Sequence, residues 1–149
     1  PAKVQVAVVE DRRGANGGAV ALAWHRDGAA RVHVTRTGTL AQAWDIAAAG
    51  ADRVYCGASL ASEPRARLLR AQPVEQRNIS AALGSLRRYA SEDALRWDGD
   101  DLAVQVRGVE IKHGSTGLQV GGKAPSELLR VAAWAVHDVR AAKPLPMLA

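Results

Sequence analysis

The chain has 149 residues and a formal net charge of +5 at pH 7, with 48% hydrophobic but only 4% aromatic residues. This length fits a single domain, residues 1–149, and the lone cysteine excludes an internal disulfide. No apolar run reaches the ~18 residues of a membrane span, which indicates a soluble, cytoplasmic protein without a membrane partner. The excess of basic residues favours an anionic partner, of which nucleic acid is the commonest.

The first part of the chain predicts a three-stranded antiparallel meander, a crossover helix and a parallel strand. These elements are expected over residues 4–11, 19–24, 31–36, 40–48 and 53–57. The meander strands are separated by a Gly-rich turn and by Asp27-Gly28. Helical spacing then runs up to Gly50, a good C-terminal stop. The next stretch is short and β-rich and follows a crossover, which favours a parallel strand in the centre of the sheet.

The rest of the chain is expected to alternate helices with short strands. First comes a helix from Pro64 that buries Leu68 and Leu69, and then a brief strand at 74–76. A helix over 81–90 capped by Ser80, a turn at 98–100 and a short helix over 102–106 follow. The last elements are a hairpin over 109–120 and a helix from Pro125. The last helix carries an apolar stripe, and the hairpin is expected to be exposed on one face.

This order of elements resembles the C-terminal nuclease domain of phage large terminases, especially the versions from phages of actinobacteria. Four stretches carry the likeness: Gly57-Ala58-Ser59-Leu60, Ile79-Ser80-Ala81-Ala82-Leu83, Leu95-Arg96-Trp97-Asp98-Gly99 and Ala132-Ala133-Trp134-Ala135. The resemblance implies an α/β fold with a ribonuclease H-like mixed sheet, three antiparallel strands and then parallel strands, flanked by helices. It also implies a role in phage DNA packaging, with DNA and a phage or host protein as partners.

In that family three acids bind two divalent metal ions, Mg or Mn, about 4 Å apart, and the metals cut DNA. Carried onto this chain, the first position falls on Glu10 or Asp11, at the end of the first strand. Strand alternation puts these two side chains on opposite faces, so only one is expected to point at the site. We take Glu10 and Asp11 as the candidate metal ligands.

The other two positions of the resemblance lack the expected acids. The central strand ends in Cys56-Gly57, and the next acid is Glu63. Where the family has an acid before the last helix, the chain has Lys123, with Glu127 one turn later and Asp138 near the helix end. Two alternatives follow: a two-metal DNA endonuclease with rewired acids, drawn from Glu10, Asp11, Glu63, Glu127 and Asp138, or an inactive relative with a degenerate acidic site.

Several basic and aromatic side chains are candidates for contacts with nucleic acid. The phosphate-tracking face consists of Arg87 and Arg88 together with Arg65, Arg67 and Arg70. Trp97 in a polar loop is a candidate stacking platform, and Lys123 lies in the Gly-rich loop before the last helix. A non-catalytic nucleic-acid or protein binding module is therefore an alternative. An oligomeric structural or assembly protein, using the last helix and the hairpin, is another.

Each candidate also has a structural explanation. Glu63 and Glu127 stand in the first turns of helices, where the helix dipole favours acids. The arginines suit a solvated helix surface. Cys56 is expected to be a small buried residue. We also expect Trp24, Trp44 and Trp134 in the core, and His25 facing His33 across the hairpin.

Overall fold

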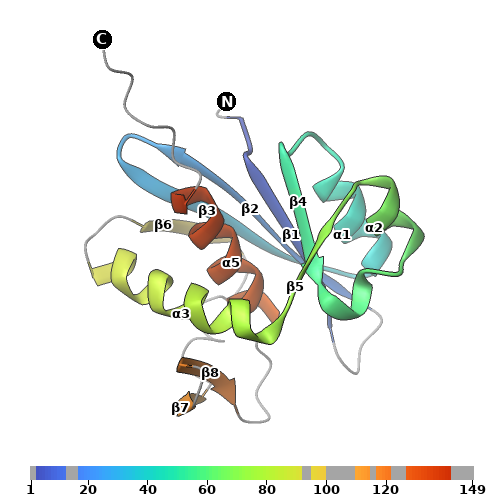
Figure 1. The fold of residues 1–149 in the computed structure, drawn as a ribbon. Helices are drawn as coiled ribbons and strands as arrows, with labels where there is room; N and C mark the ends of the chain where they lie inside the picture. Colours follow the sequence, from blue (N-terminus) through green and yellow to red (C-terminus); the bar gives the residue numbers. More distant parts are fainter. Residues whose placement is uncertain are drawn as a thin grey trace.

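The sheet that positions the site has six strands in the order β5-β4-β1-β2-β3-β6 (Figure 1). Their bounds are β1 Val6–Asp11, β2 Gly18–Arg26, β3 Ala29–Thr37, β4 Arg53–Gly57, β5 Gln72–Val74 and β6 Leu95–Gly99. This computed structural model describes residues 3–12, 17–91, 95–99, 110–114, 117–121 and 127–141. Strands β1 to β3 are antiparallel, and β4 and β5 continue the sheet parallel to β1. The ribonuclease H-like mixed sheet is thus confirmed, with β6 added parallel to β3.

The β2–β3 hairpin closes through a two-residue turn. Asp27 and Gly28 both have positive φ, 53° and 78°, the conformation that keeps the strand twist through such a turn. The register then pairs His25 with Ala30 and His33 with Leu22. The expectation that the two histidines face each other across the hairpin is therefore wrong, because the turn length fixes a different register.

Helices cover both faces of the sheet (Figure 1). Their bounds are α1 Leu40–Ala47, α2 Pro64–Leu68, α3 Gln76–Ser91 and α5 Glu127–Ala141, with a short 3-10 helix, η1, at Ala58–Leu60. Val6 and Val8 pack with residues of α3 and α5, while Ala7 and Val9 pack with residues of α1 and α2. Burial on both faces makes β1 a central strand.

Helix α1 begins at a complete capping box. The Thr39 hydroxyl accepts from the Gln42 amide at 3.2 Å, and the Gln42 side chain accepts from the Thr39 amide at 3.0 Å. Its buried face contains Trp44, the largest fully buried side chain. Trp24 and Trp134, also expected in the core, are only half-buried, although Trp134 packs against the core of the α3/α5 face.

Helix α3 begins earlier than the sequence suggested. Its start is at Gln76, so Ser80 lies inside the helix, buried, and is not the cap. The Asn78 side chain accepts from the Glu75 amide at 3.0 Å, which satisfies a donor at the helix start. The preceding strand β5 therefore ends at Val74.

Two more expectations about single residues are wrong. Leu69 packs against the core of the α1/α2 face as expected, but Leu68 is 75% exposed, because α2 is only five residues long and buries Ala66 instead. Trp97 was expected in a loop, but it lies in β6 opposite Val32.

Two further strands form the predicted hairpin. Strands β7 (Glu110–Gly114) and β8 (Gly117–Gly121) pair antiparallel, with Gly114 opposite Gly117. The predicted helix over 102–106 and the loop with Lys123 lie outside the described residues.

Candidate functional site

The carboxyl ends of β1 and β4 lie side by side at the lower edge of the sheet in Figure 1. Parallel pairing of Val9 with Cys56 places Glu10 next to Gly57. Helix α5 begins at the same edge, since Arg12, directly after β1, forms an ion pair with Glu127, the first residue of α5. The topology therefore brings Glu10, Asp11 and Glu127 to one end of the sheet, which we call the carboxyl edge.

The Glu10 side chain folds across the end of β4. Its carboxylate occupies the space beside Gly57, where any β-carbon would collide with it. The pKa of Glu10 is raised from 4.5 to about 7, chiefly by burial and also by the Asp11 carboxyl group, while the Asp11 amide and Arg130 act in the opposite direction. About half of the Glu10 carboxyls therefore carry a proton near neutral pH.

Cys56, the residue before Gly57 in β4, is completely buried. Burial and the nearby Glu10 raise the pKa of the Cys56 thiol to about 11. A thiol with so high a pKa is not ionised near neutral pH and is a poor nucleophile. Cys56 is thus a small buried residue, as the sequence suggested.

Glu127 is held between two arginines at the carboxyl edge. Its Oε1 lies 3.5 Å from the Nε of Arg12 and 3.8 Å from the Nε of Arg36, and the Glu127 side chain is only 11% exposed. Arg130, one turn further along α5, faces Glu10 closely enough to lower its pKa. We call Arg12, Arg36 and Arg130 the arginine cluster.

The remaining candidate acids lie elsewhere. Glu63 is exposed as the N-cap residue of α2 and makes no capping hydrogen bond through its side chain. Asp138 lies about 16 Å along α5 from Glu127, at the helical rise of about 1.5 Å per residue. There it accepts from Arg53 Nε at 2.9 Å and from the Tyr55 hydroxyl at 2.7 Å.

The residues at the carboxyl edge do not fit a two-metal centre. Gly57 offers no side-chain oxygen opposite Glu10, and Glu127 is already surrounded by guanidinium groups. Hard divalent ions need several oxygen ligands with net negative charge. Within the described ranges, no group of three or more His, Cys, Asp or Glu side chains is placed to hold a metal ion.

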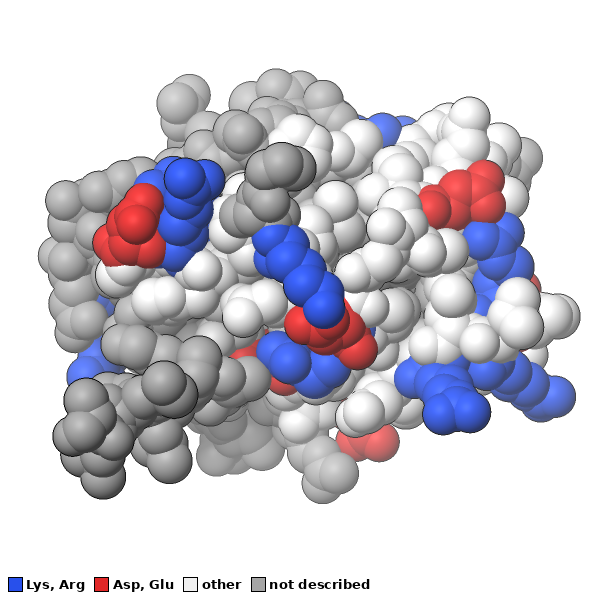
Figure 2. All heavy atoms as spheres, turned by 90° about the horizontal axis from the view of Figure 1, so that it is seen from above, with Lys and Arg blue, Asp and Glu red and all other residues white. Residues whose placement is uncertain are grey.

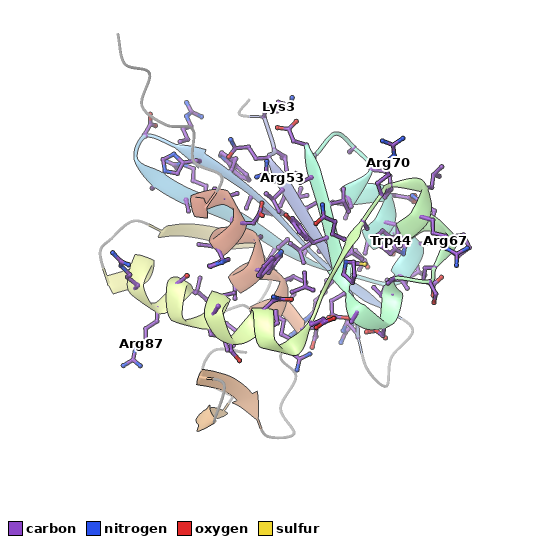
Figure 3. All side chains as sticks on the ribbon, viewed as in Figure 1. Lys3, Trp44, Arg53, Arg67, Arg70 and Arg87 are labelled. Atoms are coloured by element: carbon purple, nitrogen blue, oxygen red, sulfur yellow. The ribbon has the colours of Figure 1, made fainter. Side chains whose placement is uncertain are left out.

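The arginines predicted to contact nucleic acid do not form one face. Arg65, next to α2's start, donates to Asp45 at 2.8 Å. Arg87 and Arg88 are exposed near the end of α3. Figure 3 shows Arg87 on one side of the molecule and Arg67, from α2, on the other. Contacts of these residues, of Trp97 and of Lys123 with DNA stay predictions.

Sequence reasoning missed the arginine cluster. A signal for it was present, because Arg12 follows the acid pair and Arg36 lies near the end of β3, which runs parallel to β1. The carboxyl ends of strands that run in the same direction meet at one edge of a sheet. Arg130 follows Glu127 at i+3, on the same helix face.

Comparison of the chain with protein-family models, with curated proteins and with solved structures finds no match. Among the helices that the structure describes, none has the length and apolar character to cross a membrane.

Proposed function

We propose that this chain is a non-catalytic relative of the terminase nuclease domain, which binds the phosphate backbone of DNA through arginines. One observation carries the proposal: the arginine cluster stands at the sheet edge where the resemblance expects metal-binding acids. In this proposal the chain works in the cytoplasm, during phage DNA packaging.

Guanidinium groups are suited to this task. In a two-metal nuclease the ions neutralise the phosphate charge and hold its oxygens. An arginine supplies a permanent positive charge and several donors that match phosphate oxygens, but it does not generate a metal-bound hydroxide. Arginines at this edge therefore support binding without hydrolysis.

Arg12 retains donor capacity for such a contact. Its Nε is buried and makes no hydrogen bond, since the Glu127 oxygen lies at 3.5 Å, and its side chain is 35% exposed. A phosphate oxygen that approached Arg12 would relieve an unsatisfied buried donor. The overall charge of +5 also supports attraction of a polyanion.

The charge of the edge depends on Glu10. At a pH well below 7 its carboxyl is neutral, which leaves Asp11 and Glu127 as the acids that oppose the three arginines. Lower pH thus makes this edge more positive, and DNA affinity is expected to rise as the pH falls through 7.

The test measures DNA binding and DNA cleavage on the same protein. Fluorescence anisotropy of a labelled duplex and of a labelled single strand, at increasing salt, is compared with nicking of supercoiled plasmid in Mg and in Mn. We expect the affinity for DNA to fall as the salt concentration rises and to stay the same when metal ions are chelated. We expect no cleavage of the plasmid. Arg12→Ala and Arg36→Ala should each weaken binding about threefold to tenfold, whereas Arg26→Ala, at the exposed β2–β3 turn, should not.

Two results would overturn the proposal. Metal-dependent cleavage that disappears in Glu10→Ala or Asp11→Ala would establish the rival function, an endonuclease with rewired acids. Absence of DNA binding together with a mass that grows with protein concentration would favour the structural or assembly protein.

A further inference from the structure

A pocket of about 320 Å³ opens at the opposite end of β4 from the arginine cluster. It lies between the end of α1, the start of β4 and the residues that follow α2. Its walls include Ala47, Ala51, Val54 and Leu69, and its polar members include Asp52 and Arg70. A volume of this size lies at the lower end for ligand sites, so it suits one large side chain better than a whole cofactor.

Arg70 stands at a position where glycine is usual. It follows α2 in a left-handed conformation, with φ of 54°. The Ala71 amide donates to the Ala66 carbonyl at 2.8 Å, and the Arg70 amide donates to the Arg67 carbonyl at 3.2 Å. This is the Schellman ending, whose left-handed residue is most often glycine because a β-carbon is strained there. A non-glycine residue at this strained position motivates a hypothesis in which the arginine side chain has a use.

The residues that precede the pocket-lining Leu69 and Arg70 along the chain are exposed, and they are both apolar and basic. Leu68 is 75% exposed, the one large hydrophobic side chain that is exposed among the described residues. Arg67 and Arg70, on either side of it in the sequence, are exposed, and among the described side chains no ion pair engages them. Figure 3 shows both guanidinium groups directed away from the body of the molecule. Seen from above in Figure 2, basic side chains gather on the side of α2, whereas elsewhere on that face blue and red groups adjoin.

We propose that this pocket binds an acidic peptide segment of another protein, which inserts one aliphatic or aromatic side chain between α1 and α2. Carboxylates that flank the anchor pair with Arg67 and Arg70, and the neighbouring apolar residues cover Leu68. Two features favour this occupant: the positive charges of Arg67 and Arg70 complement its acids, and the apolar walls of the pocket suit its apolar anchor. A nucleic-acid backbone would satisfy the arginines but would leave Leu68 and the pocket walls without an apolar partner.

This site is separate from the carboxyl edge, so the two are testable independently. A displayed library of random peptides is selected on the full chain and counter-selected on the Arg67→Glu/Arg70→Glu variant. The enriched peptides are expected to combine one large apolar residue with at least two acids. Their affinity, measured by calorimetry, should fall at least about tenfold in the double variant, because like charges then oppose each other. Arg26→Glu is the control for net charge and should bind as the wild type does.

Two further measurements test the role of Arg70 and of the peptide's acids. Arg70→Gly preserves the helix ending and relieves the strain, so this variant should unfold at a higher temperature and bind the peptide more weakly. A peptide whose acids are replaced by lysine should bind the double variant better than the wild type. Failure to enrich any peptide, or enriched peptides that bind the double variant equally well, would overturn the proposal. If no peptide is selected and the double variant also fails to bind duplex DNA, the surface is a nucleic-acid site instead.

Discussion

Helix α5 has an acid that meets arginine near each of its ends, and the two contacts differ in kind. Near the C-terminal end, Asp138 makes hydrogen bonds of 2.9 and 2.7 Å to Arg53 and Tyr55 of β4. At the N-terminal end, Glu127 lies 3.5 and 3.8 Å from two arginines, outside close hydrogen-bond geometry. Close hydrogen bonds fasten a helix to a sheet, whereas the looser contact leaves the Arg12 Nε without a hydrogen bond. The same residue types therefore fasten the helix at one end and, in the proposed function, bind phosphate at the other.

Removal of the tight contact should have the largest effect on stability. Asp138→Ala leaves Arg53 and the Tyr55 hydroxyl without their acceptor in a half-buried place, so we expect the free energy of unfolding to fall by about 3 kcal/mol. Urea denaturation measures this. Tyr55→Phe, which removes one hydrogen bond, should cost about 1 kcal/mol. DNA affinity should not change, and a matching loss of affinity would contradict the division between the two ends.

The second prediction concerns the buried acid at the carboxyl edge. The pKa of Glu10 is raised from 4.5 to about 7, so the folded protein holds this proton more tightly than the unfolded chain does. The stabilisation is complete below pH 4.5 and is lost as the pH rises through 7. Glu10→Gln should therefore stabilise the protein by about 2 kcal/mol at about pH 8, after allowance for partial exposure, and much less at about pH 5. An equal gain at both pH values would show that ionisation is not the cause.

The third prediction concerns Arg70, at the end of β4 where Asp138 also lies. Arg70→Gly should stabilise the protein, in contrast to Asp138→Ala, and by a smaller amount. Because glycine adopts the left-handed conformation without strain, we expect a gain of about 1 kcal/mol in the free energy of unfolding. Arg67→Gly, one turn earlier inside α2, is the matched control and should destabilise the protein by about 1 kcal/mol. If both substitutions destabilise, the positive φ of Arg70 carries no strain.

The smallest change in stability is expected where the contacts are loose. Glu127→Gln should alter the free energy of unfolding by less than about 1 kcal/mol, because ion pairs without close hydrogen bonds contribute little. It removes a negative charge from between Arg12 and Arg36, so duplex affinity should rise about threefold at low salt. Anisotropy titrations provide the measurement. A fall in affinity would mean that Glu127 orients the arginines and does not compete with the phosphate.

Much of the fold was predictable because local signals agree with the tertiary structure. The alternation along β1 to β3, the Asp27-Gly28 turn and the helical spacing of α1 and α5 each favour one conformation. The errors fall where a competing local interaction decides the outcome. Asn78, rather than Ser80, satisfies a donor at the start of α3, and the early Schellman ending of α2 leaves Leu68 outside the core.

The site was harder to predict than the fold, for a physical reason. The resemblance pointed to Glu10 and Asp11 at the end of the first strand and to Glu127 at the start of the last helix, so these acids were found along the sequence. The arginine cluster is assembled from three segments that meet only through the sheet and α5. The sequence signal for this meeting is indirect, because it emerges only once the directions of β1 and β3 and the start of α5 are known.

Gly57 also limits which side chains can replace it. Since the Glu10 carboxylate fills the volume beside it, an aspartate at residue 57 requires that Glu10 first swing away or shorten. A second carboxylate at this end of β4 therefore demands coordinated changes at two positions. The present Glu10 side chain and any side chain at residue 57 exclude each other.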